Sequence, residues 1–219
     1  MPLPEDVTFA DPNREIERHC KHLPHWQQEG AAYFITFRLA DSLPESKLAA
    51  WRSERDTWLA LHPEPWTQDV EREYHRRFSN TMERWLDEGH GSCLLRAAGN
   101  ANIVAEVLRN FDSVRYTQHA WVVMPNHVHG LFSLHADCRL EDTVKSWKGV
   151  SARRINVALG RSGSLWMTDY FDRLIRDEEH FWNCARYIRQ NPVKGKLQAG
   201  RFILYESKTV KQHLDAAGV

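Results

Sequence analysis

Several features that would define common protein classes are missing from this sequence. No run approaches the ~20 apolar residues that a membrane-spanning helix needs. The N-terminal segment lacks the positively charged start and apolar stretch of a targeting signal. The four cysteines lie far apart without a CxxC pair, which argues against a zinc module and against a dense disulfide framework. We therefore expect a reduced, cytoplasmic protein without a membrane partner.

Net charge and phosphate-binding loops are also missing. Lys plus Arg and Asp plus Glu each number 29, so any nucleic-acid contact must depend on local basic patches. The chain has no glycine-rich phosphate loop, no GxSxG and no HExxH. These absences argue against a nucleotide hydrolase, an esterase and a metalloprotease.

The hydrophobic pattern predicts alternating strands and helices. Strands are predicted at residues 31–39, 114–124, 127–134 and 171–176, and helices at 46–61, 69–88, 101–111, 140–159 and 177–190. Residues 1–29 are polar and rich in His, which predicts an irregular arm. Asn191-Pro192 is expected to end the last helix, because the residue before a proline disfavours the helical conformation.

This order of elements predicts the fold class. Without the first two helices, it is the β-α-β-β-α-β arrangement of ferredoxin-like folds, followed by an appended C-terminal helix. We predict an α+β protein with an antiparallel sheet, forming a single domain over residues 1–219. Its core is expected at about 30–43 and 99–197, and a helical insertion at about 44–98, after the first strand.

The clearest local motif is His127-Val128-His129, at the start of a predicted strand. Residues i and i+2 of a strand point to the same face, so the two imidazoles can converge on one metal ion. Imidazole binds several divalent metals, and oxygen ligands would shift the preference towards Mg²⁺ or Mn²⁺. The alternative is coincidence, because a chain with twelve histidines places some of them two apart.

The last predicted helix carries two stripes. The core stripe consists of Phe181, Cys184, Ala185 and Ile188. A second stripe, spaced by four, consists of Asn183, Tyr187 and Asn191. Tyr187 is a candidate nucleophile, although a phenol with a pKa near ~10 needs a cation or base nearby to attack. Alternatively Tyr187 only packs, with its hydroxyl in water, and Tyr170 is the rival nucleophile.

The predicted helix at 140–159 is basic. Backbone phosphates attract cations and unpaired bases stack on aromatic rings, so a DNA-binding face is one interpretation and an ordinary solvated face is the other. The candidate DNA-binding residues are Lys145, Trp147, Lys148, Arg153 and Arg154, with Lys194 beyond Tyr187.

Together these motifs resemble a known family. Met124-Pro125-Asn126-His127-Val128-His129 resembles the "MPNHVH" sequence of the single-tyrosine (HUH) transposases of single-stranded DNA. The segment from Tyr187 to Lys194, reading YIRQNPVK, and the segment from Tyr33 to Pro44 are similar to the REP-associated tyrosine transposases. The resemblance extends over about residues 30–197.

The resemblance implies a fold, a site and an activity. The implied nucleophile is Tyr187, and the implied ligands of Mg²⁺ or Mn²⁺ are His127, His129 and Asn191. Insertion-sequence relatives have Gln where this chain has Asn191, the usual residue of the REP-associated branch, and Gln190 is a weaker candidate ligand. The implied activity is cleavage and joining of hairpin-containing single-stranded DNA (REP-like palindromes) through a 5′-phosphotyrosine.

Other properties stay open at this level. The relatives include both monomers and homodimers, and association with the nucleoid is expected of such an enzyme. A non-catalytic module that binds hairpin DNA or RNA on the same fold is the main alternative. A structural zinc protein is a third interpretation, which the missing Cys/His ligand set argues against.

Overall fold

The computed structural model describes residues 3–4, 7–11, 13–14, 17–20, 24–63 and 66–219. Its centre is an antiparallel sheet of strand order β6-β3-β5-β4-β7. The strands are β3 (Ala32–Arg38), β4 (Tyr116–Val123), β5 (His127–Leu134), β6 (Phe171–Leu174) and β7 (Ile203–Glu206). The order β6-β3-β5-β4 is that of a ferredoxin-like sheet, so the predicted α+β class is confirmed.

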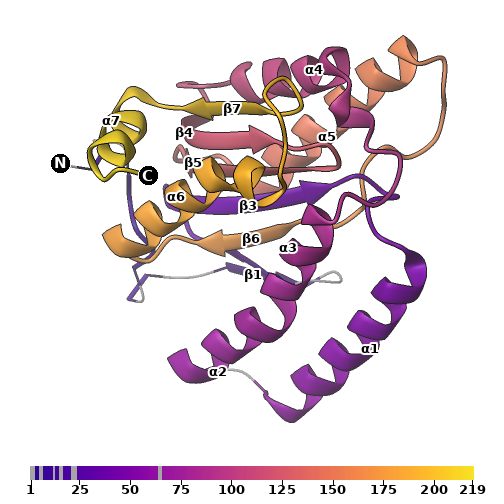
Figure 1. Ribbon diagram of the computed structural model, residues 1–219. Coiled ribbons are helices and arrows are strands. Elements are labelled where there is room, and N and C mark those ends of the chain that lie inside the picture. The colour runs from indigo at the N-terminus through magenta and orange to yellow at the C-terminus, as the bar shows by residue number, and fades with distance from the viewer. Residues whose placement is uncertain (1–2, 5–6, 12, 15–16, 21–23, 64–65) are drawn as a thin grey trace.

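Helices cover both faces of the sheet (Figure 1). On one face, α4 (Ala98–Arg109) and α5 (Leu140–Ala158) pack against alternate strand residues such as Phe37 and Val128. On the other, α6 (Glu178–Lys194) and α7 (Lys208–Ala216) pack against Phe34 and Leu131. Because neighbouring strand residues face opposite ways, His127 and His129 lie on the α6 face.

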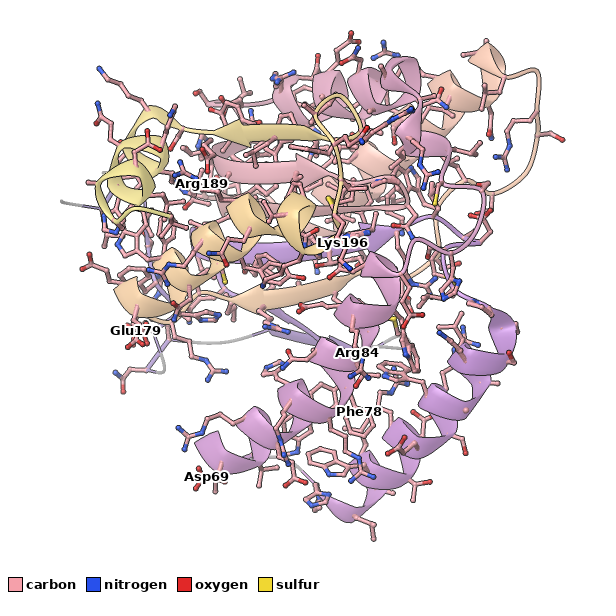
Figure 2. All side chains as sticks on the ribbon, in the orientation of Figure 1. Asp69, Phe78, Arg84, Glu179, Arg189 and Lys196 are labelled. Carbon is pink, nitrogen blue, oxygen red and sulfur yellow. The ribbon has the colours of Figure 1, made fainter. Side chains whose placement is uncertain are left out.

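The predicted insertion forms a helical unit beyond the β6 edge of the sheet (Figure 1). It contains α1 (Glu45–Leu61), α2 (Gln68–Tyr74), the π-helical turn η1 (His75–Ser79) and α3 (Asn80–Asp87), followed by the 3₁₀ turn η2 (Leu94–Arg96). The insertion has a hydrophobic cluster of its own, which includes Trp51, Trp58 and Phe78. Figure 2 shows Phe78 and Arg84 marking the path of η1 and α3 towards the sheet. The single helix predicted at 69–88 is therefore three segments, and the predicted break at 62–65 includes two residues outside the described ranges.

Both ends of the chain depart from prediction. Within the predicted irregular arm, β1 (Glu17–Cys20) and β2 (Pro24–Gln27) form an antiparallel pair, and several of the other residues lie outside the described ranges. Nothing was predicted at β7 and α7. The signal for α7 was present, since Ser207 accepts a hydrogen bond from the Val210 amide as an N-cap and Val210 and Leu214 bury one face. No helix in the described ranges is long and apolar enough to cross a membrane.

The predicted end of α6 at Asn191-Pro192 is wrong. The helix continues through Pro192 to Lys194, and the amide of Gly195 bonds to the Asn191 carbonyl 2.9 Å away. An internal proline removes one helical hydrogen bond, and here the burial of Asn191 and Pro192 offsets that loss. The extra turn keeps Lys194 on the same helical face as Tyr187, two turns away.

Candidate active site

The β4–β5 hairpin positions the histidine pair. The amide of Met124 bonds to the His127 carbonyl at 2.9 Å, which closes the turn at Pro125-Asn126. His127 and His129 then point to the same face, with ring centroids 4.6 Å apart. Both side chains are buried, at 1% and 0% exposure. The convergence expected from strand periodicity is therefore present.

Each imidazole has one nitrogen engaged and one free. The Nδ1 of His127 lies 2.7 Å from Asn126 Oδ1, and the Nδ1 of His129 lies 2.7 Å from Thr36 Oγ1. Asn126 uses its own amide N–H groups on the Leu86 and His90 carbonyls, so its Oδ1 accepts and His127 carries its proton on Nδ1. Neither Nε2 has a hydrogen-bond partner among the described residues. This arrangement is typical of metal-binding histidines.

Burial keeps both imidazoles neutral. It lowers the pKa of His127 to about 3, and it lowers the pKa of His129 well below its ordinary value, with the neighbouring His127 contributing. A neutral imidazole offers a lone pair to a cation without first losing a proton.

Asn191 supplies an oxygen beside the pair. Its side chain is 0% exposed and lies within reach of the His127 imidazole, but neither Oδ1 nor Nδ2 makes a hydrogen bond of standard geometry among the described residues. Polar atoms buried in this way are costly unless something binds them. Two imidazole nitrogens and an amide oxygen fit a divalent cation. The described residues contain no cluster of three His, Cys, Asp or Glu that could hold a metal, so the amide is needed to complete a protein set of three.

Tyr187 lies against the histidine pair. Its ring is 5.2 Å from that of His129, edge to face, and 5.8 Å from that of Phe34. Lys194 Nζ lies 4.7 Å from the centre of the phenol ring. The hydroxyl is buried close to the Glu83 carboxyl group and makes no hydrogen bond of standard geometry in the described part of the chain. Its burial contradicts the alternative of a hydroxyl in water. The three residues of the predicted stripe differ in burial: Asn183 is exposed, Tyr187 is half-buried and Asn191 is buried.

Two acids that sequence reasoning missed also act on this phenol. Burial raises the pKa of Tyr187, and the carboxyl groups of Glu83 and Asp87 on α3 raise it further. Burial also raises the pKa of Glu83, and that of Asp87 to about 6. Their spacing of four places both on one helical face. Burial and the two acids therefore disfavour the phenolate, whereas the Arg173 guanidinium favours it.

The basic helix lies on the opposite face of the sheet from the histidine pair. Lys145 and Arg153 are exposed. Lys148 donates to the Thr168 carbonyl at 2.6 Å, and its burial lowers the pKa to about 8. Arg154 pairs with Glu106 of α4 at 2.5 Å. The structure therefore brings together His127, His129, Tyr187, Asn191 and Lys194, but not the cations of α5.

Trp147 is a core residue, so its predicted role in stacking on unpaired bases is wrong. It is 2% exposed, its indole N–H donates to the Tyr116 hydroxyl at 2.9 Å, and its ring centroid is 4.7 Å from that of Phe132. We expect Trp147→Ala to destabilise the protein by about 3–5 kcal/mol, because it leaves a large cavity and removes the hydrogen bond that the Tyr116 hydroxyl accepts, while that hydroxyl keeps its bond to the Leu108 carbonyl. Urea unfolding measures this cost. A loss below about 1 kcal/mol would contradict the core role.

The rival nucleophile Tyr170 and the rival ligand Gln190 do not lie in the environment that surrounds Tyr187 and Asn191. Tyr170 is 7% exposed and belongs to the hydrophobic cluster on the α5 face, where burial raises its pKa. Gln190 is half-buried and is not among the buried unpartnered amides, in contrast to its neighbour Asn191.

The segment that contains the site is similar to a known family of proteins. Residues 100–191 match the family described as "Transposase IS200 like". The match begins in α4, ends at Asn191 and leaves out the helical insertion. The resemblance predicted from the motifs is therefore confirmed.

More distant similarities were also found. An uncharacterised protein of Haemophilus influenzae is 28% identical over 104 residues, which are 38% of this chain and 57% of that protein. The match thus spans less than two thirds of the length of that relative. Two solved structures are similar at 18% identity. One is a REP-associated tyrosine transposase bound to a REP hairpin (80% of this chain, 74% of that one, TM-score 0.42), and the other is a Deinococcus radiodurans protein described as a "putative transposase" (75% and 93%, TM-score 0.36).

Proposed function

We propose that this chain, whose residues 100–191 match the IS200-like transposases, is a metal-dependent endonuclease and strand-transferase of hairpin-containing single-stranded DNA. The observation that carries the proposal is the contact of the Tyr187 ring with His129, beside unpartnered nitrogens and the Asn191 amide. His127, His129 and Asn191 would hold Mg²⁺ or Mn²⁺. When bound, such an ion polarises a phosphate oxygen and stabilises developing negative charge.

The chain's own residues supply the nucleophile. Tyr187 Oη forms a bond to phosphorus, the bond to the 3′ oxygen breaks, and that oxygen leaves as a free 3′-hydroxyl after taking up a proton. The product is a 5′-phosphotyrosine, which keeps the phosphodiester energy, so another 3′-hydroxyl can reverse the step with a different strand. Lys194, next to the phenol ring, favours both the phenolate and an approaching phosphate.

A labelled hairpin with single-stranded flanks tests the function. The stems are copied from inverted repeats beside the gene, and the full chain is incubated with each hairpin and Mn²⁺ before a denaturing gel. We expect a covalent protein–DNA adduct that disappears when the metal is chelated. If the hairpins bind but none of them forms a covalent adduct, the result would instead support a non-catalytic binding module. Sedimentation of the complex distinguishes the monomer from the homodimer.

The exposed cations of α5 are proposed to contact DNA on the second face of the sheet. Lys148 and Arg154 have protein partners, so Lys145 and Arg153 provide the cleaner test. The slope of log K against log salt is negative for DNA binding. We expect the pair Lys145→Glu and Arg153→Glu to make this slope less steep by about 2, or ~1 for each lost phosphate contact. Fluorescence anisotropy on a hairpin measures it. The exposed cations of the control pair, Arg201→Glu and Lys208→Glu, should not change the slope, and an unchanged slope in the α5 pair would exclude this helix from the DNA path.

A further inference from the structure

A cavity of about 340 Å³ lies between the helical insertion and the β6 edge of the sheet. Phe34 and Thr36 line it on the sheet side. The same two residues contact His129, since the Phe34 ring stacks on the imidazole at 5.6 Å and Thr36 Oγ1 lies 2.7 Å from Nδ1. The cavity therefore adjoins the histidine pair and shares residues with its support.

The lining combines aromatic rings with a few polar groups. Trp66 and Tyr74 come from the insertion and Phe171 from β6. Arg173 and His180 offer N–H donors, and Glu83 offers an acceptor that lies 3.5 Å from Arg173. Rings with donors and acceptors at their edges are how proteins hold an unstacked nucleobase.

The balance of charge argues against a phosphate pocket. The charged side chains that line the cavity are Arg72, Arg173, Arg176, Glu83, Asp172 and Asp177. Equal numbers of arginines and carboxylates give no net attraction for an anion. A neutral heterocycle suits such a lining, and the volume lies within the usual range of small-molecule pockets, ~300–1,000 Å³.

We infer that this cavity holds one unpaired nucleobase of the single-stranded substrate, next to the scissile phosphate. The inference rests on the proposed function and deepens it by making the insertion a specificity element. The residues matched to the family supply the histidines and the tyrosine, whereas α2, η1 and α3 supply one wall of the base pocket. The chain would then choose its cleavage point partly by the base that fits here.

Trp66 and Trp85 form a matched pair for the test. Both are half-buried and pack against the hydrophobic cluster of the insertion, but only Trp66 lines this cavity, whereas Trp85 lines a cleft formed with residues of α1 and η1. Hairpins carrying 2-aminopurine at one flanking position each are titrated with the full chain in the Tyr187→Phe background. We expect fluorescence quenching at a single position next to the cleavage point. Trp66→Ala should remove this quenching and weaken binding about tenfold, while Trp85→Ala should not change either.

A second readout uses cleavage itself. Chains with an intact Tyr187 are incubated with Mn²⁺ and a hairpin pool whose flanks are randomised, and the strands joined to the protein are sequenced. The parent chain should show a base preference at the quenched position, which falls at least about tenfold in Trp66→Ala. If Trp66→Ala does not fold, Arg72→Ala is compared with Arg76→Ala, because Arg72 lines the cavity and Arg76 lines the same cleft as Trp85.

The outcomes separate the two proposals. Quenching or base preference that persists in the Trp66 and Arg72 variants overturns the base pocket, whether or not an adduct forms. An adduct without any preference at the flanks also overturns it and leaves the nuclease standing. If no adduct forms on any pool, the nuclease fails, and loss of 2-aminopurine quenching in Trp66→Ala then supports the pocket as part of a binding module.

Discussion

Replacing Tyr187 with Phe should abolish the covalent adduct while leaving the fold unchanged. The substitution removes only an oxygen. This oxygen makes no hydrogen bond of standard geometry among the described residues, although it lies close to the Glu83 carboxyl group. The ring contacts with His129, Phe34 and Lys194 stay. We therefore expect a change in unfolding free energy within about 0.5 kcal/mol and a fall in adduct formation of at least about 10⁴-fold, since no other group replaces a lost nucleophile.

The rival tyrosine gives the control for this result. Tyr170→Phe alters a phenol that packs in the cluster on the α5 face and also lines the cavity beside His129. It removes no atom from the proposed metal set, so adduct formation should persist. The measurements are the denaturing gel, hairpin binding by anisotropy and thermal unfolding, all on the same preparations. An adduct that survives in Tyr187→Phe and disappears in Tyr170→Phe would reassign the nucleophile. Loss of the adduct together with a large loss of stability would show a packing role for the hydroxyl instead.

Local periodicity predicted which residues of the candidate site share a face, and the family resemblance supplied their expected roles. The HxH spacing on a strand placed His127 and His129 on one face, and the spacing of four on a helix placed Tyr187 and Asn191 together. The strand and helix order likewise predicted the ferredoxin-like sheet. These features depend on backbone geometry within one element or on the order of elements, and both can be read along the chain.

The same reasoning explains the error at Trp147. Residues 140, 144, 147, 151 and 155 recur at helical spacing, and all of them are buried. The apolar stripe of α5 was therefore visible in the sequence, and the tryptophan belonged to it rather than to the cations around it. For Trp147, the helical spacing with other buried positions is stronger evidence of its role than its closeness in sequence to Lys145 and Lys148.

The contribution of the insertion could not be predicted in this way. Glu83 and Asp87 reach Tyr187 because α3 ends beside the β4–β5 turn, where Asn126 donates to the Leu86 and His90 carbonyls. That docking depends on contacts between segments some 40 residues apart. No local pattern in the sequence encodes it, and the cavity beside His129 arises from the same docking.

The second large effect is expected on metal binding. His129→Ala removes a buried nitrogen whose orientation is fixed by Thr36, so affinity for Mn²⁺ should fall at least about hundredfold. Asn191→Leu keeps the branched shape of the side chain and removes the proposed oxygen ligand, so affinity should fall at least about tenfold. Isothermal titration with Mn²⁺ alone measures both changes without DNA or catalysis. Asn183→Leu, an exposed position on the same helix, should leave the affinity unchanged.

Stability distinguishes a ligand from a structural residue at Asn191. Its two buried polar atoms lack partners in the described part of the chain, so without metal Asn191→Leu should raise the unfolding free energy by about 1–2 kcal/mol. Excess Mn²⁺ should stabilise the parent chain and not the variant, because a ligand that binds only the folded state shifts unfolding by mass action. If Asn191→Leu destabilised the metal-free chain, or bound Mn²⁺ as tightly as the parent, the amide would be structural. The combination of lost affinity and gained stability is the one that a residue kept for binding produces, since such residues reduce the stability of the metal-free fold.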